Sequence, residues 1–104
     1  MDFDFTGKVI LVTGGTRGIG KSIVEHFTTL GGEVIATGQD REQLEALRGA
    51  IAPKDRERIH YHHLDLLESG SCETFLSEVT RTYSRIDVLV NNAGINKVAP
   101  ITEA

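Results

Sequence analysis

Three glycines at fixed spacing, Gly14, Gly18 and Gly20, follow an apolar run and are the strongest chemical signal in the sequence. A run such as Val9–Val12 that leads into a glycine-rich turn and then a helix predicts a backbone shaped to receive a ligand. The first N–H groups of such a helix have no partner within it and carry the positive end of its dipole. The spacing therefore predicts a diphosphate site, with Arg17 as a positive charge inside the loop.

The same stretch satisfies a second phosphate-binding pattern, because residues 15–22 match the P-loop of nucleotide triphosphatases. A triphosphatase needs an acid after a neighbouring strand to hold Mg²⁺, and Asp65 is the candidate. A dinucleotide site instead needs small and polar groups after several strands. The chain supplies them at Thr13–Gly14, Asp65–Leu66 and Asn91–Gly94. We therefore favour a dinucleotide, and Lys21 and Ser22 are then solvent-facing or packing residues.

Two other groups of reactive side chains are explained by packing. Alternation along a strand puts His60 and His62 on one face and His63 and Asp65 on the other, a poor arrangement for a metal site. We expect no metal. Cys72 has no histidine or basic neighbour at helical spacing that would activate its thiol, so we predict a packing residue.

The elements that must position these groups alternate between short strands and helices. Buried strands are predicted at 9–12 and 33–37, and further strands at 59–66 and 86–90. The first predicted helix has an apolar face of Ile19, Ile23, Phe27 and Leu30 and ends at Gly31–Gly32. The second begins at a cap, Asp40, carries Leu44, Leu47 and Ile51, and ends before Pro53. The third has a face of Phe75, Val79 and Tyr83, which Leu76 widens. This alternation predicts an α/β fold, a doubly wound parallel sheet with the order β-α-β-α-β-α-β and helices on both faces.

Composition and charge narrow the class of protein. The 104 residues carry a net charge of −4 from 15 acidic and 11 basic side chains, with no basic block, so we expect no nucleic-acid partner. The longest apolar run has four residues and the start lacks a secretory pattern, so we expect no membrane partner. A single cysteine fits a reducing compartment, and we predict a cytoplasmic protein.

The fourth predicted strand is followed only by a short segment. An apolar strand with an open edge is prone to aggregate, so we expect the fold to be incomplete on its C-terminal side and the chain to be part of a longer protein. Alone, it should be poorly stable or associate through the edge at Asp87–Val90. Pairing between chains would protect that edge, and we expect a homo-oligomer.

The segments TGGTRGIG, LDL and NNAG, in this order, resemble the short-chain dehydrogenase/reductase family in its classical branch, from Gly7 to about Ile95. The resemblance implies a Rossmann-like fold in which residues 1–104 are the N-terminal, cofactor-binding part of a single domain. It also implies roles for individual residues. The diphosphate and the adjoining ribose bind to Gly14 to Ile19, including Thr16. The adenine amino group forms a hydrogen bond with Asp65, and Leu66 lies beside it. The adenosine ribose lies along Asn92, Ala93 and Gly94, while Asn91 ties neighbouring strands together.

The resemblance further implies a nicotinamide-dependent oxidoreductase that transfers a hydride between the cofactor and a small carbonyl or alcohol substrate. The family's catalytic serine, tyrosine and lysine lie beyond the fourth strand. Neither Tyr61 nor Tyr83 has a lysine four residues later, so no catalytic residue is carried over and we expect the 104-residue chain alone to be inactive. The alternative is a non-catalytic dinucleotide-binding or scaffold protein.

Arg17 bears on the choice of cofactor. NAD sites place an acid about 20 residues after the glycines, at the end of the second strand. Here that place is Gly38, and the nearest acid, Asp40, caps a helix. Without a carboxylate to repel it, a 2′-phosphate can accept hydrogen bonds from Arg17. In the family, a basic residue before the second glycine accompanies NADP. Gln39, where many NADP-preferring relatives carry a second arginine, keeps NAD as the alternative.

Overall fold

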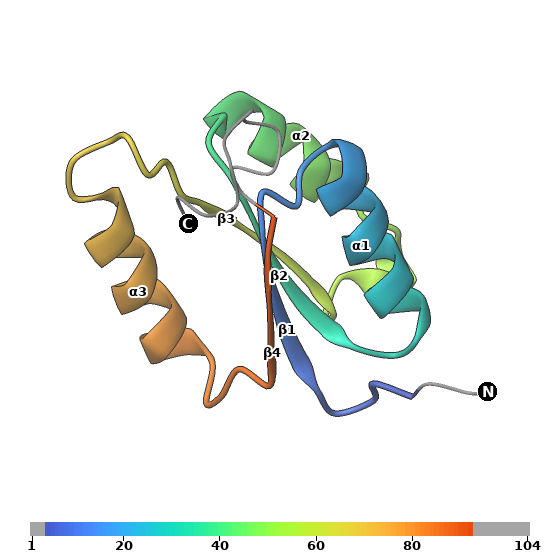
Figure 1. Ribbon diagram of the computed structural model, residues 1–104. Coiled ribbons are helices and arrows are strands. Elements are labelled where there is room, and N and C mark those ends of the chain that lie inside the picture. The colour runs from blue at the N-terminus through green and yellow to red at the C-terminus, as the bar shows by residue number, and fades with distance from the viewer. Residues whose placement is uncertain (1–3, 93–104) are drawn as a thin grey trace, which may run out of the picture.

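The structure, a computed structural model, describes residues 4–92 and contains the elements in the predicted order (Figure 1). A short 3-10 helix, η1, follows the second α-helix and was not predicted. The bounds are β1 Val9–Thr13, α1 Gly18–Thr29, β2 Glu33–Gly38, α2 Arg41–Ala50, η1 Pro53–Asp55, β3 Ile59–His63, α3 Ser71–Thr82 and β4 Val88–Asn91.

The four strands form one parallel sheet in the order β3-β2-β1-β4. Helices α1 and α2 cover one face of the sheet and α3 covers the other (Figure 1). This confirms the predicted doubly wound α/β fold. Because all strands are parallel, their carboxyl ends lie along a single edge, where the loops after each strand meet.

Each face of the sheet has its own apolar core, because successive strand residues point to opposite sides. The core under α1 contains Ile10, Val12, Val24, Val34 and Ala36, and the core under α3 contains Val9, Leu11, Ile35, Phe75 and Val79. The buried strands predicted at 9–12 and 33–37 are confirmed by β1 and β2, whereas β3 is half-buried throughout and β4 alternates between half-buried and exposed residues.

The buried face of α1 differs from the predicted stripe. The helix turns Gly20 and Val24 toward the sheet, whereas Ile19 is 62% exposed. Ile23 and Phe27 pack against the core under α1 and are partly buried, as predicted. The predicted face was wrong at Ile19, because the closest approach of helix and sheet is made by the small residue Gly20 and not by a larger one.

Helix α3 confirms part of its predicted face. Phe75 and Val79 are buried, and Tyr83 packs beside them. Leu76 is 53% exposed and does not widen the stripe. Cys72 is exposed at the start of the helix, so the prediction that it is a packing residue was wrong.

Strand β3 ends three residues earlier than predicted. The N–H of Leu64 makes the last bond to β2, at the carbonyl of Gly38, where β2 itself ends. The next N–H, that of Asp65, has no strand left to pair with and donates to the hydroxyl of Ser71 at 2.9 Å. The chain therefore leaves the sheet just before the first predicted site residue of this loop.

Strand β4 forms one edge of the sheet and begins at Val88, two residues later than predicted. Leu89 is 63% exposed there.

Within residues 4–92, no helix combines the length and the apolar character needed to cross a bilayer.

Candidate functional site

The predicted site residues meet at the carboxyl edge of the sheet. The loop of residues 14–17 follows β1, Gly38 ends β2, Asp65 follows β3 and Asn92 follows β4. Four loops far apart in sequence are thus brought to one edge, as the dinucleotide hypothesis requires. Two predicted residues, Ala93 and Gly94, lie outside the described part of the chain.

The three glycines of the loop have different physical roles. Gly14 and Gly18 have φ angles of +69° and +60°, a region that favours glycine. A Cβ on Gly18 would meet nothing within 4 Å, so the backbone is open to a ligand there. A Cβ on Gly20 would lie 2.0 Å from the carbonyl oxygen of Gly14 and 2.5 Å from Nδ2 of Asn92. Only glycine at position 20 lets the helix start this close to β1.

The N-terminus of α1 is free to bind an anion. Its N-cap residue, Arg17, makes no side-chain capping bond, and the first turn contains no acid. By contrast, α2 is capped as predicted, since Oδ1 of Asp40 accepts the N–H groups of Glu42 and Gln43 at 3.0 and 3.2 Å. The Arg17 side chain is exposed and forms no ion pair with any residue from 4 to 92. The helix end therefore offers uncompensated N–H groups and a cation.

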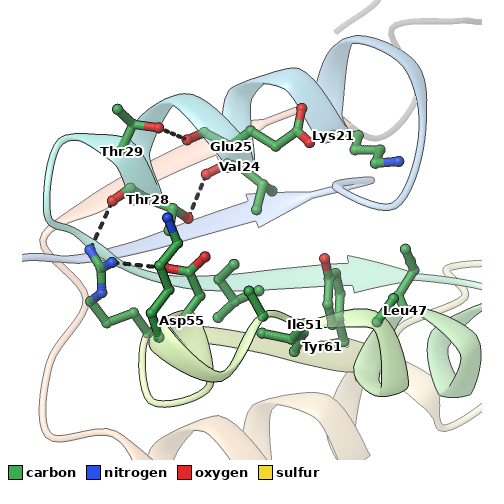
Figure 2. A pocket seen from close by; sticks show the side chains of 14 residues that line it. Lys21, Val24, Glu25, Thr28, Thr29, Leu47, Ile51, Asp55 and Tyr61 are labelled. Carbon is green, nitrogen blue, oxygen red and sulfur yellow. Dashed lines mark hydrogen bonds and ion pairs between the residues drawn. The ribbon is translucent and has the colours of Figure 1, made fainter.

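The P-loop interpretation is not supported by the position of Lys21. That lysine lines a groove of about 560 Å³ between α1 and α2, with Glu25 beside it and Leu47 on the opposite wall (Figure 2). Gly15 is needed for packing, since a Cβ there would lie 2.9 Å from both Ala36 and Val24 side chains. Both residues of the pattern thus serve the α1–α2 face of the sheet.

The loop after β3 holds Asp65 in a defined position. Its N–H is bound by Ser71, and its Oδ1 accepts the N–H of Leu67 at 3.0 Å. Its Oδ2 has no protein partner within residues 4–92, so that oxygen can accept a bond from a ligand amine. Leu66 is 67% exposed beside it. Ser71 was not predicted as a site residue. The feature that could have identified it is a small polar residue at the start of a helix.

The end of β4 is tied to the glycine loop. Asn92 is 7% exposed, and its Nδ2 donates to the carbonyl of Gly14 at 3.0 Å. Its N–H donates to Oγ1 of Thr13 at 3.0 Å, and that hydroxyl donates to Oδ1 of Asn91 at 3.1 Å. Thr13 and Asn91 therefore join β1 to β4, as predicted for Asn91. The Asn92 side chain therefore holds the glycine loop in place through its bond to Gly14.

The end of β2 holds the loop from the other side. Thr16 is buried against Gly38, where a Cβ would lie 2.4 Å from Cγ2 of the threonine. Thr37, which the sequence analysis did not single out, accepts a bond from the N–H of Gly14. Thr16 and Gly38, both predicted, are thus adjacent, and the loop is fixed on both flanks.

His60 and His62 of β3 lie against α3 and the residue that follows it, Tyr83. His62 Nε2 is 2.9 Å from the hydroxyl of Tyr83, and His60 Nε2 is 2.8 Å from a carboxylate oxygen of Glu33. Burial, and secondarily Glu33, raises the pKa of Tyr83 to about 12. Between residues 4 and 92, no three His, Cys, Asp or Glu side chains gather as a metal ion would need.

The chain is similar in sequence to known proteins. A family model described as short chain dehydrogenase matches residues 8–104. The 3-oxoacyl-[acyl-carrier-protein] reductase FabG of Aquifex aeolicus is 40% identical over 97 residues, which are 93% of this chain and 39% of the relative. The NADP-dependent 3-hydroxy acid dehydrogenase YdfG of Escherichia coli is 36% identical over 87 residues, 84% of this chain and 34% of the relative.

Solved structures agree with the fold. The chain matches the Pseudomonas aeruginosa RhlG/NADP active-site complex with a TM-score of 0.76 at 28% identity, over 88% of this chain and 36% of that one. The chain therefore spans well under half the length of the proteins it matches.

Proposed function

The chain belongs to the short-chain dehydrogenase family, and from that premise we propose that residues 1–104 are the cofactor-binding part of an oxidoreductase. The reaction is the transfer of a hydride between NADP(H) and a small carbonyl or alcohol substrate. The observation that carries the proposal is the uncapped N-terminus of α1 behind the glycine loop, at the edge where Asp65 and Asn92 also lie. When bound, the nicotinamide supplies the hydride chemistry.

The residues of this chain bind and orient the cofactor. The loop from Gly14 to Ile19 lies along the diphosphate, and the N–H groups at the start of α1 donate to it. Oδ2 of Asp65 accepts the adenine amino group, with Leu66 against the ring, and Asn92 to Gly94 follow the adenosine ribose. Support comes from the open backbone at Gly18 and from the free carboxylate oxygen of Asp65.

We assign the cofactor preference to Arg17. Oδ1 of Asp40 accepts two N–H groups of α2, so this acid is placed as a helix cap and does not stand at Gly38, the end of β2. Arg17 is exposed and unpaired within residues 4–92, which leaves its guanidinium free for a 2′-phosphate. Of the similar proteins, YdfG is described as NADP-dependent and RhlG is described in complex with NADP. These points favour NADP over NAD.

The test is Arg17→Ala in the protein expressed from its complete gene, with dissociation constants measured for NADPH and NADH. We expect NADPH binding to weaken by about 1.5–3 kcal/mol, the contribution of a hydrogen bond to a charged group, while NADH binding is unchanged. Arg56→Ala is the matched control, because Arg56 is an exposed arginine beside η1, away from the carboxyl edge. Equal losses for both cofactors, or tighter NADH binding by the unmutated protein, would refute the assignment.

The activity itself is tested by following nicotinamide absorbance with a panel of ketones and alcohols. No oxidation or reduction of either cofactor by a folded protein would refute the oxidoreductase. This outcome is separate from the cofactor preference, which binding alone measures.

We also propose that the protein is cytoplasmic and forms a homo-oligomer. The single, exposed thiol of Cys72 is compatible with a reducing compartment. The edge of β4 carries the exposed Leu89, which another chain would cover. Cell fractionation tests the first point. For the second, Leu89→Lys should shift the sedimentation of the 104-residue chain toward the monomer, and an unchanged oligomer would exclude this edge.

A further inference from the structure

Thr37, at the end of β2, is bonded directly to the glycine loop. Its side chain is 2% exposed, and its Oγ1 accepts the N–H of Gly14 at 3.1 Å. Its carbonyl accepts the N–H of Gly15 at 2.9 Å. Within residues 4–92 this hydroxyl makes the one side-chain hydrogen bond from β2 to the loop.

Gly14 is fixed from three directions. Thr37 holds its N–H from β2, and Asn92 holds its carbonyl from the end of β4 at 3.0 Å. The same carbonyl lies against Gly20 of α1, where a Cβ would be 2.0 Å away. A displacement of the Gly14 peptide must therefore move the first turn of α1, whose N–H groups are uncapped.

We propose that Thr37 is a positioning residue for the diphosphate of the cofactor. Its hydroxyl sets the Gly14 peptide, and through it the N–H groups of Gly18, Ile19 and Gly20 that face the anion. Because the Gly14 N–H is used by Thr37, it does not itself bind the diphosphate. The inference rests on the proposed function, since it needs a dinucleotide at this loop. It assigns Thr37 to neither the 2′-phosphate nor the substrate.

The substitution that tests this is Thr37→Val, which removes the hydroxyl and keeps the shape. The part-buried N–H of Gly14 then loses its acceptor, and we expect the loop to shift as this N–H finds another partner. We expect the dissociation constants of NADPH and NADH to rise equally, by about tenfold. Thr37→Ser keeps the hydroxyl and should restore near-normal binding. In steady-state assays the Michaelis constant for the cofactor should rise with little change in kcat.

Thr28→Val is the matched control. Thr28 is also a buried threonine, and its hydroxyl donates to the carbonyl of Val24 at 2.8 Å within α1 (Figure 2). Losing it removes a buried hydroxyl from the same helix–sheet layer, away from the glycine loop. The control should change stability without changing the affinity for either cofactor. A tenfold loss in this variant too would mean that loosening the layer is sufficient, and would overturn the inference.

A second readout does not depend on ligand binding. Amide hydrogen exchange followed by NMR reports on single N–H groups. Thr37→Val should speed exchange at Gly14 more than at Gly15, whose partner is the backbone carbonyl of Thr37. Equal exchange at Gly14 in the variant and the unmutated protein would show that the hydroxyl does not hold the loop.

The outcomes separate the two levels of inference. If the unmutated protein binds neither cofactor, the proposed function fails and the role of Thr37 toward a diphosphate fails with it, whatever the exchange data show. If it binds, and Thr37→Val binds equally well, the positioning role is refuted while the function stands. Should Thr37→Val fail to fold, Thr37→Ala removes the same hydroxyl with a smaller side chain and is judged by the same binding criterion.

Discussion

Replacing Gly20 by alanine should separate packing from helix propensity. Gly20 lies in the first turn of α1, and alanine is intrinsically better than glycine in a helix by about 1 kcal/mol. Propensity alone therefore predicts a more stable protein. The structure predicts the opposite, because the added Cβ would lie 2.0 Å from the carbonyl oxygen of Gly14.

The size of the effect follows from that contact. Real Cβ atoms essentially never come closer than 3.0 Å, so helix and loop must separate by about 1 Å. The obstacle is backbone, which cannot turn away as a side chain can. Overpacking of this kind costs about 1–3 kcal/mol, and loss of the bond from Asn92 to Gly14 adds about 1 kcal/mol. After the gain in propensity, we expect a net loss of about 2 kcal/mol.

The matched control is Gly49→Ala. Gly49 is an exposed helical glycine in α2, and a Cβ there would meet nothing within 4 Å. This variant should gain about 0.5–1 kcal/mol. Urea denaturation with linear extrapolation measures both free energies of unfolding. If Gly20→Ala were as stable as Gly49→Ala, the close approach of α1 to Gly14 would not exist and our account of the third glycine would be wrong.

Two further substitutions test hydrogen bonds that stabilise the fold, one at the start of α2 and one at the start of β1. Asp40→Ala should lower the free energy of unfolding by about 1 kcal/mol in urea titrations, because two N–H groups of α2 lose their acceptor; an unchanged midpoint would exclude the cap. The pKa of Asp87 is lowered, mainly by the N–H of Val9 and also by Arg85, so its contribution to stability is present above its unfolded pKa and is lost as the pH falls through the folded value. Asp87→Asn should therefore be less stable at neutral pH, and its urea midpoint should fall less between neutral pH and about pH 3 than that of the unmutated protein; parallel curves would contradict this.

The sequence predicted the fold well, because β1 and β2 are short, buried runs of mainly apolar residues and the strands alternate with amphipathic helices along the chain. It was less successful on the face of α1. The larger apolar residues Ile19, Ile23 and Phe27 recur at helical spacing, but the helix turns Gly20 and Val24 inward. The periodicity argument counts large apolar side chains, so a contact made possible by the absence of a side chain does not show in the pattern.

The residues missed at the site share one property. Thr37 and Ser71 are buried hydroxyl residues that bond to the backbone of another loop. Neither residue belongs to a recognisable ligand-binding motif. Thr37 bonds to a loop distant in sequence, and Ser71 bonds to Asp65 across a turn. Motifs identify the residues that approach a ligand. The side chains that hold those residues in place depend on tertiary contacts, which a single sequence does not contain.

The P-loop pattern in residues 15–22 shows how one string of residues can satisfy two motifs. In this fold Gly15 is required by the side chains of Ala36 and Val24, and Lys21 lines the groove on the α1–α2 face. Gly20 is required by the carbonyl of Gly14. Both glycines have a packing reason that is independent of a triphosphate, and Lys21 is exposed at the groove. The anion-binding capacity lies instead in the uncapped turn that begins at Gly18, with Arg17 before it, and a dinucleotide is the ligand whose other half reaches the loops after β3 and β4.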